Sequence, residues 1–195
     1  HNPIENPKPF SQKKDFKLMS LLFLGRIGKR KGIFDLLNVI AENKTNYLNN
    51  VKLIIGGDGD IKELETFIKL NQLHGIVEYK GWVDGDLKHA LLSECDILVL
   101  PSYNEGLPVA ILEAMSYGRA ILSTTVGGIP EIVRHGVNGF LFQPGDRVAL
   151  ANYIDFLLVN KGKIIEMSLM SKEMSSNYTI ELILKRLLEV YEKIK

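Results

Sequence analysis

The stretch PSYNEGLPVAILEAMSYG, residues 101–118, passes from a polar turn into an apolar helical pattern. Pro108 suits the first position of a helix, where its missing N–H would have no partner. The helix is therefore expected to begin near Leu107. Glu105 and Glu113 stand eight positions apart across this boundary. Eight helical residues advance about 12 Å and complete a little over two turns, so both carboxylates are expected near one face but far apart along the axis.

This spacing bears on what the two carboxylates contact. An acid and a base that act on one glycosidic bond stand roughly 5 to 9.5 Å apart, so Glu105 and Glu113 are expected at the two ends of one long ligand. The free N–H groups and the dipole of the helix N-terminus favour an anion between them. A nucleotide sugar has that composition: a hydroxylated head, an anionic middle and a hydroxylated tail.

Short apolar runs alternate with helical patterns along the chain, and six of them are typical of buried strands. These runs are residues 20–24, 51–55, 76–80, 96–100, 119–123 and 140–142. The alternation favours an α/β fold, a doubly wound, parallel, six-stranded Rossmann-like sheet covered on both faces. We expect residues 1–177 to form this domain, with a Pro- and Asn-rich linker at 1–17. Residues 178–195 carry an apolar stripe that predicts a C-terminal helix.

Glycine-rich turns follow several of these runs. GRIGKRKG at 25–32 combines glycines with basic side chains at the start of a helix, an arrangement that favours phosphate. The alternative is that Lys29, Arg30 and Lys31 are simply charged side chains exposed to solvent, with no ligand. GGDGD at 56–60 is equally explained by a tight turn with Asp60 as N-cap. The glycines at 127–128 allow close approach of a ligand or of a neighbouring turn, and no turn has the GxGxxG spacing of a dinucleotide site.

Composition narrows the class of protein. The 195 residues allow one domain with a proper core, and 24 basic against 23 acidic side chains argue against nucleic acid as a partner. Cys95 is the single cysteine, so the chain suits a reducing compartment. The four histidines lack the spacing of a metal site, and no apolar run approaches the ~20 residues of a membrane span. A start at His1 rather than Met indicates a piece of a longer protein.

In this order, the motifs resemble those of the family-four retaining glycosyltransferases with the GT-B fold, specifically their C-terminal, donor-binding domain. The E-x7-E motif of that family matches Glu105 and Glu113, and its G-R-x4-K-G motif matches Arg26 and Lys31. The GGIPE segment at 127–131 follows in the same order. One departure is that many members have Phe-Gly at the positions of residues 107 and 108.

The resemblance implies a set of site residues. Arg26 and Lys31 would hold the donor diphosphate, Glu105 would contact the transferred sugar, and Glu113 would bind the ribose. Arg26, Lys31 and Glu105 form the implied catalytic group. Further donor contacts are implied for Gly57, Val83, Gly106, Leu107 and Val109. Trp82 or Val83 would provide a shelf for the base, although an indole packed in the core explains Trp82 as well.

The resemblance also implies substrates and partners. The donor would be a nucleotide-diphosphate sugar and the acceptor a glycan or a lipid-linked glycan, with no cofactor and no metal. The acceptor site would belong to an N-terminal domain of the same protein, through which any membrane contact would be made. The C-terminal helix at 178–195 would be a crossing helix that returns to that domain. The chain by itself is expected to bind donor without transferring it. We expect a bacterial protein of polysaccharide biosynthesis in the cytoplasm, with a peripheral place at the inner face of the cell membrane left open.

Two other functions stay open at this point. A nucleotide-sugar epimerase uses the same scaffold, although the E-x7-E pattern speaks against it. A non-catalytic module that binds nucleotide sugars would need the same residues. A dehydrogenase is the weakest alternative, because the dinucleotide turn is missing.

Overall fold

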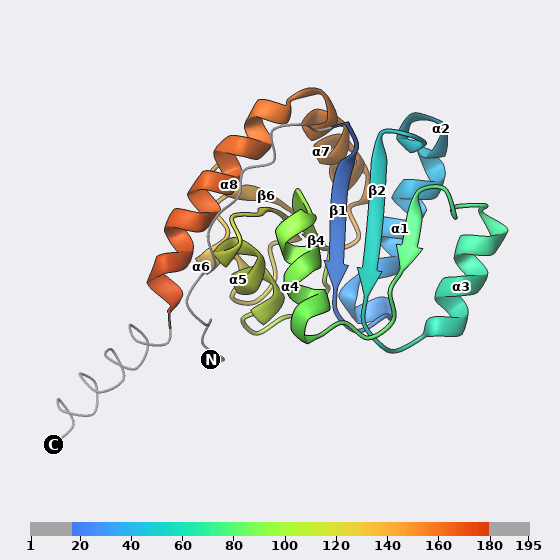
Figure 1. Cartoon of the computed structure of the whole chain (residues 1–195), viewed down its shortest axis with the longest axis horizontal. Coiled ribbons are helices and arrows are strands. Elements are labelled where there is room, and N and C mark those ends of the chain that lie inside the picture. The colour runs from blue at the N-terminus through green and yellow to red at the C-terminus, as the bar shows by residue number, and fades with distance from the viewer. Residues whose placement is uncertain (1–16, 180–195) are drawn as a thin grey trace, which may run out of the picture.

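The computed structural model describes residues 17–179 and contains one six-stranded parallel sheet in the order β3-β2-β1-β4-β5-β6 (Figure 1). The strands are β1 (Met19–Leu24), β2 (Val51–Gly56), β3 (Val77–Tyr79), β4 (Ile97–Leu100), β5 (Ala120–Thr124) and β6 (Gly139–Phe142). Every expected run overlaps a strand, so the predicted doubly wound α/β fold is confirmed.

Helices cover both faces of the sheet (Figure 1). One face carries α1 (Ile33–Glu42), α3 (Ile61–Leu70) and α7 (Arg147–Val159). The other carries α4 (Gly85–Glu94), α5 (Val109–Ser116) and α8 (Lys161–Ser175). The short pieces are α2 (Lys44–Tyr47), α6 (Ile129–Ile132) and the 3₁₀ turns η1 (Lys29–Lys31) and η2 (Ser176–Tyr178).

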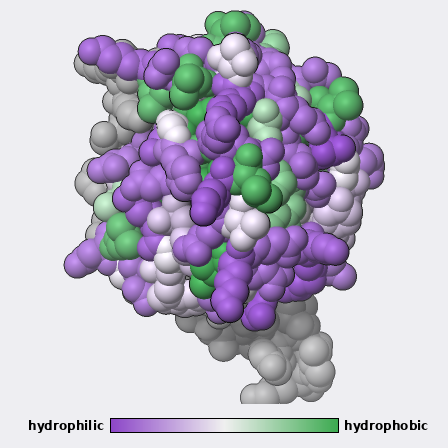
Figure 2. Space-filling view, turned by 90° about the vertical axis from the view of Figure 1, so that its right-hand side faces the viewer, coloured by the Kyte–Doolittle hydropathy of each residue, from purple (hydrophilic) through white to green (hydrophobic). Residues whose placement is uncertain are grey.

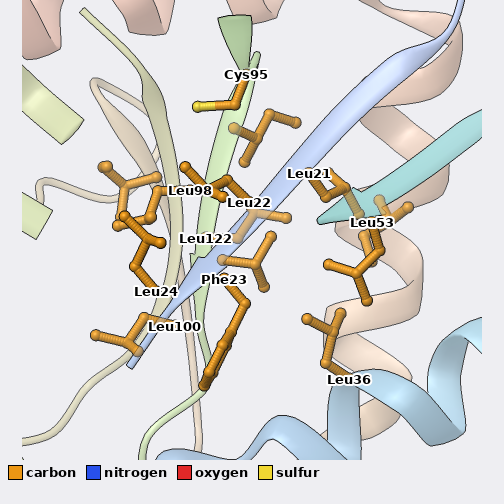
Figure 3. Close-up of a cluster of buried hydrophobic side chains, with 14 of the residues drawn as sticks. Leu21, Leu22, Phe23, Leu24, Leu36, Leu53, Cys95, Leu98, Leu100 and Leu122 are labelled. Carbon is orange, nitrogen blue, oxygen red and sulfur yellow. The ribbon is translucent and has the colours of Figure 1, made fainter. Parts of the chain in front are cut away.

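The hydrophobic core lies on both sides of the central strands (Figure 3). All six residues of β1 and all four of β4 are buried, as expected for strands covered on both faces. Leu22 of β1, Leu98 of β4 and Leu36 of α1 belong to this one cluster. Cys95 is also buried there.

The order of the strands fixes where a ligand can bind. From β1 the chain proceeds to β2 and β3 on one side, whereas β4, β5 and β6 follow on the other. β1 pairs in parallel with both β2 and β4. The loops 25–32 and 101–108, which leave β1 and β4, therefore lie at the topological switch point, where the order of the strands reverses. Open α/β sheets bind their ligands at such points.

Helix α8 is an element that the sequence pattern does not predict. It packs against α5 and β5. Its buried residues are Ile164 and Met167 together with three serines, Ser168, Ser171 and Ser175. Ser171 Oγ donates to the carbonyl of Asn138 at 3.2 Å, and Ser175 Oγ donates to the carbonyl of Lys172 at 2.7 Å. A helix can bury hydroxyls that are satisfied in this way, but it then shows no apolar stripe.

The expected start of α5 is wrong. Pro108 has φ −73° and ψ 114°, which is extended backbone, and it is the N-cap, so the helix begins at Val109. Proline disfavours helical backbone at the preceding Leu107, which prevents an earlier start. Glu105 thus lies in the loop, and the helical separation expected between Glu105 and Glu113 does not apply.

The surface over α3 and the edge strand β3 is mainly hydrophilic, with hydrophobic side chains in separate spots (Figure 2). Between residues 17 and 179, no helix is both long and apolar enough to span a bilayer. The linker expected at 1–17 and the crossing helix expected at 178–195 lie outside the described residues except at their inner ends. The division of the chain into these segments stays a prediction.

Candidate functional site

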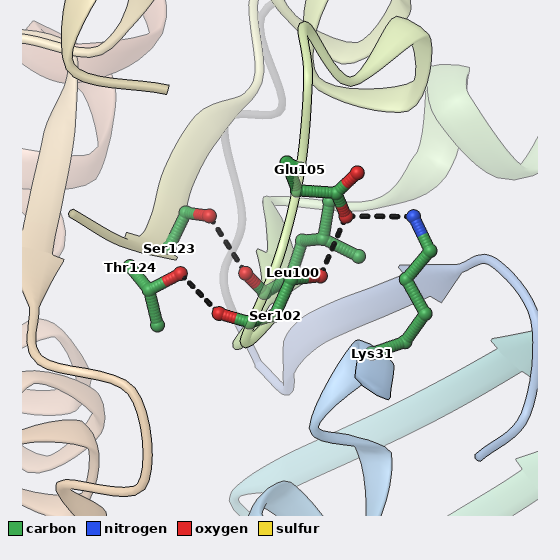
Figure 4. Close-up of polar contacts among 6 residues, drawn as sticks. All are labelled: Lys31, Leu100, Ser102, Glu105, Ser123 and Thr124. Atoms are coloured by element: carbon green, nitrogen blue, oxygen red, sulfur yellow. Dashed lines mark hydrogen bonds and ion pairs between the residues drawn. The ribbon is translucent and has the colours of Figure 1, made fainter. Parts of the chain in front are cut away.

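Lys31 and Glu105 join the two loops at the switch point (Figure 4). Lys31 Nζ lies 2.6 Å from Glu105 Oε1, and the two side chains are only 18% and 7% exposed. The residues are 74 positions apart in the chain, so only the fold brings them together. Removing one partner of such a shielded pair leaves the other charge without compensation. The pair marks the centre of the candidate site.

Hydrogen bonds from buried hydroxyl groups fix the loop that carries Glu105 (Figure 4). Ser102 Oγ donates to Glu105 Oε1 at 2.6 Å. Thr124 Oγ1 donates to the carbonyl of Ser102 and Ser123 Oγ to that of Leu100, both at 2.6 Å. Ser102, Ser123 and Thr124 are fully buried. Oε1 of Glu105 thus accepts from two donors, whereas Oε2 has no partner among the described residues and can accept from a ligand.

The glycines that follow β5 bring a turn against this loop. The N–H of Gly128 donates to the carbonyl of Gly106 at 2.7 Å. Gly127 has φ +53°, and a Cβ atom there would lie 1.8 Å from the carbonyl oxygen of Glu105. Of the two roles left open for these glycines, the approach of neighbouring turns is the one observed.

The glycine turns after β1 and β2 also pack on one another. Ile27 N–H donates to the carbonyl of Asp58 at 2.6 Å, and Asp60 N–H donates back to Ile27 at 3.0 Å. A Cβ at Gly57 would lie 1.9 Å from the carbonyl oxygen of Gly25. The N–H and carbonyl of Gly57 are both used inside the protein. Asp60 is at the N-cap position of α3, but its side chain makes no capping hydrogen bond.

The loop before α5 and the first residue of that helix present backbone donors beside Glu105. The N–H groups of Gly106, Leu107 and Val109 form no hydrogen bond within residues 17–179. Pro108 has no N–H to offer. The N–H groups at the N-terminus of a helix favour an anion, and Lys31, which is positively charged, favours an anion at the same place.

Glu113 is paired as well. Lys88 Nζ of α4 lies 2.7 Å from Glu113 Oε1 of α5, and both side chains are partly exposed. His89 Nδ1 and the hydroxyl of Tyr117 form a second contact between the same two helices. Sequence reasoning did not identify Lys88, because a lysine in a polar helix carries no local signal of its partner.

The remaining predicted residues lie around this centre. Arg26 is exposed on the loop that also carries Lys31, and it has no partner in the part of the chain described. Val83 is partly buried against Gly56. Trp82 is 66% exposed, so the alternative prediction that its indole packs in the core is wrong. The indole N–H donates to Asp84 Oδ2 at 2.9 Å. Residues 17–179 contain no cluster of three or more His, Cys, Asp or Glu side chains placed to hold a metal ion.

Comparison with known proteins shows which family the chain belongs to. Residues 5–177 match the family described as Glycosyl transferases group 1. An uncharacterized glycosyltransferase of Methanocaldococcus jannaschii is 31% identical over 175 residues, which is 88% of this chain and 44% of that relative. The chain thus spans about half the length, or less, of the first curated relatives that it matches.

Solved structures show the same relationship. HepE of Anabaena, solved with UDP and with UDP-glucose, has a TM-score of 0.81 at 25% identity in its UDP complex, covering 91% of this chain and 49% of that one. The C-terminal domain of the group 1 glycosyl transferase LpcC of Francisella tularensis has a TM-score of 0.75 at 22% identity, covering 88% and 96%. The chain therefore belongs to the glycosyl transferases of group 1 and has the fold of a GT-B C-terminal domain.

Proposed function

We propose that the chain is the donor-binding half of a retaining glycosyltransferase. The protein would transfer a sugar from a nucleotide-diphosphate sugar to a glycan or lipid-linked acceptor. The observation that carries this proposal is the Lys31–Glu105 pair at the switch point, beside the free N–H groups of Gly106, Leu107 and Val109. HepE, a similar structure, is solved with UDP and with UDP-glucose, which supports a nucleotide sugar as the ligand.

The diphosphate would lie at the positive end of this arrangement. Arg26 offers a planar fork and Lys31 a point charge, and both suit phosphate oxygens. The N–H groups of Gly106, Leu107 and Val109 would add neutral donors. As the bond to the sugar breaks, negative charge grows on the leaving diphosphate. Donors fixed in advance around that charge stabilise the transition state.

The two carboxylates would hold the hydroxylated ends of the donor. Glu105 Oε2 would accept a hydrogen bond from a hydroxyl of the transferred sugar, since Oε1 is already occupied. Glu113, paired with Lys88, would accept from the ribose. Val83 or Trp82 would lie beside the base. Gly57 would act through the packing of its turn, because its own N–H and carbonyl are occupied.

We infer that donor binding needs no metal and no cofactor, because Arg26 and Lys31 would supply positive charge at the diphosphate. A chelator such as EDTA should leave the affinity for donor unchanged. The acceptor site would come from an N-terminal domain of the same protein. The 195-residue chain by itself should then bind donor without transferring its sugar.

A thermal-shift screen against UDP, GDP, ADP and their common sugar conjugates tests the proposal. A ligand at a hundredfold excess over its Kd adds about 2.7 kcal/mol to the free energy of unfolding, which raises Tm by roughly 5 to 10 °C in a domain of this size. Arg26→Ala should abolish that rise. Lys62→Ala, which removes an exposed charge from α3, should not. A screen in which no nucleotide raises Tm would contradict the proposal.

A further inference from the structure

A hollow lies between η1, the start of α1 and Tyr103 of the loop after β4. Its volume is about 540 Å³, within the roughly 300 to 1,000 Å³ of small-molecule sites. It is lined by Lys29, Arg30, Gly32, Phe34, Asp35 and Tyr103. We call it the Tyr103 pocket. None of these six residues has a part in the donor site described above.

The 3₁₀ turn η1 separates the two sites. Its residues Lys29, Arg30 and Lys31 complete one turn, and with three residues per turn their side chains diverge by about 120°. Lys31 contacts Glu105, whereas Lys29 and Arg30 line the Tyr103 pocket. Tyr103 itself stands two residues before Glu105. The pocket and the donor site thus share η1 and the loop after β4.

Tyr103 is exposed but fixed in place. Its hydroxyl donates to Asp35 Oδ2 at 2.9 Å, and its N–H donates to the carbonyl of Arg30 at 2.9 Å. A Cβ at Gly145 would lie 2.8 Å from the hydroxyl oxygen, so backbone packs closely there. The hydrogen bond to Asp35 raises the pKa of Tyr103, as expected when a phenol donates its proton to a carboxylate. A tyrosine ring held at both ends offers a binding surface with little entropy left to lose.

The charges of the pocket favour an anion. Asp35 is the one carboxylate among its lining residues, and it already accepts from Tyr103. Lys29 and Arg30 are exposed and form no ion pair with any residue between 17 and 179. Arginine and lysine bind carboxylates and phosphates. Phe34 adds a second aromatic ring, which offers an apolar face for contact.

We propose that the Tyr103 pocket is an acceptor subsite for an acidic sugar unit. The C–H face of a pyranose ring would pack on the rings of Tyr103 and Phe34, while its carboxylate or phosphate binds Lys29 and Arg30. This inference rests on the proposed function, which requires an acceptor to approach the sugar held by Glu105. It assigns part of the acceptor contact to the donor-binding half of the protein.

Backbone amide NMR of the 195-residue chain tests this inference with two oligosaccharides of equal length. Hyaluronan tetrasaccharide carries carboxylates, and N-acetylchitotetraose is its uncharged match. We expect hyaluronan to shift the amide signals of Gly32, Phe34 and Tyr103 and to bind about tenfold more tightly, the effect of one charge-assisted hydrogen bond. The double variant Lys29→Ala, Arg30→Ala should lose this difference. Tyr103→Ala should weaken both oligosaccharides.

Several outcomes would overturn the inference. Equal affinity for both oligosaccharides would remove the role of the charges, and shifts confined to other amides would remove the pocket. Inorganic phosphate that matches hyaluronan in affinity would show an ion site without a sugar platform. Addition of UDP to the same samples separates the two proposals. UDP binding without hyaluronan binding defeats only the pocket. Hyaluronan binding without UDP binding defeats the donor site and, with it, the acceptor role of the pocket, and leaves only a saccharide-binding site. Retained UDP binding by Tyr103→Ala would show that its loop is intact.

Discussion

Among individual residues, Glu105 has an orientation that depends on groups from three parts of the chain. Lys31 comes from η1, Ser102 from the loop after β4, and Thr124, at the end of β5, fixes the carbonyl of Ser102. A carboxylate fixed by several charge-assisted or buried hydrogen bonds presents its remaining oxygen in one direction. This predicts that groups which never touch the donor influence how well its sugar is bound.

Ser102→Ala removes the hydroxyl that donates to Glu105 Oε1. A hydrogen bond to a charged group contributes about 1.5 to 3 kcal/mol. If about half of that acts through the orientation of Glu105, affinity for the nucleotide sugar should fall roughly 4- to 13-fold, with the affinity for the bare nucleotide unchanged. Isothermal titration of both ligands measures this split.

Ser123→Ala is the matched control, because it removes an equally buried hydroxyl that bonds to the carbonyl of Leu100 rather than to Glu105. It should cost stability but preserve the preference for the sugar conjugate. The same loss of sugar affinity in both variants would mean that Ser102 acts only by stabilising the fold.

The sequence could identify several residues of the candidate site but not their contacts. Motif spacing singled out Lys31, Glu105 and Glu113, because the same residue types recur at that spacing in the family. It could not show that Lys31 meets Glu105 across 74 positions, since that depends on the strand order. Lys88 escaped notice because its partner Glu113 lies on another helix.

At the scale of elements, the loops at the switch point are packed against one another through glycines. Gly127 lies against the carbonyl of Glu105, and Gly57 lies against Gly25. The approach is too close for any side chain, so these glycines are explained by packing as well as by positive φ. We therefore expect a side chain at Gly127, which follows β5, to displace the loop that carries Glu105, which follows β4.

Gly127→Ala and Gly136→Ala separate these two effects. Both positions have a left-handed backbone, with φ +53° and +77°, but a Cβ at Gly136 meets no atom within 4 Å. Gly136→Ala should cost about 1 to 2 kcal/mol through backbone strain alone. Gly127→Ala should cost at least about 2 kcal/mol more, through the overlap with Glu105, and should weaken donor binding. Urea unfolding gives both free energies. Equal costs would contradict the packing of these turns.

The elements differ in how far the sequence predicts them. The six strands were predictable because strands buried on both faces need continuous apolar runs. Asp146 was predictable as the cap of α7, and its carboxylate does accept from the N–H of Ala149. Helix α8 was not predictable, because Ser171 and Ser175 occupy buried positions where an apolar stripe would be sought.

Considered as a whole, the molecule places its candidate site through the reversal of strand order between β1 and β4. No single element contains the site, which draws on η1, the loop after β4, the start of α5 and the end of β5. Donor binding and folding stability are therefore expected to depend on one another. A ligand that binds only the folded state stabilises the entire domain.

The buried Tyr47 should lower the free energy of unfolding at alkaline pH. Its side chain is fully buried, and its hydroxyl makes no hydrogen bond of normal length within residues 17–179, although the carboxylate of Asp155 lies close enough to interact with it. Burial, and secondarily the charge of Asp155, raise the pKa of Tyr47 well above its ordinary value of 10.0. The folded state thus keeps a proton that the unfolded state loses. The contribution is complete below pH 10 and is lost as pH rises from there toward the folded pKa, at about 1.4 kcal/mol per pH unit.

Tyr47→Phe should remove this contribution to the alkaline loss. Below pH 10 the variant should be as stable as the parent or more stable by about 1 kcal/mol, since it buries no unpaired hydroxyl. Urea unfolding on either side of pH 10 measures the slope. Tyr153→Phe, at a partly exposed tyrosine, should leave the alkaline loss in place. Parallel curves for Tyr47→Phe and the parent would refute the assignment.

The most direct test of the donor site compares one nucleotide with its sugar conjugate in the parent chain and in Glu105→Gln. For the nucleotide that gives the largest thermal shift, isothermal titration should show the conjugate binding more tightly to the parent. Glu105→Gln should lose that preference while its affinity for the bare nucleotide is kept or increased, because Lys31 is released from Glu105 to the diphosphate. A variant that still prefers the conjugate, or a parent that never does, would contradict the account.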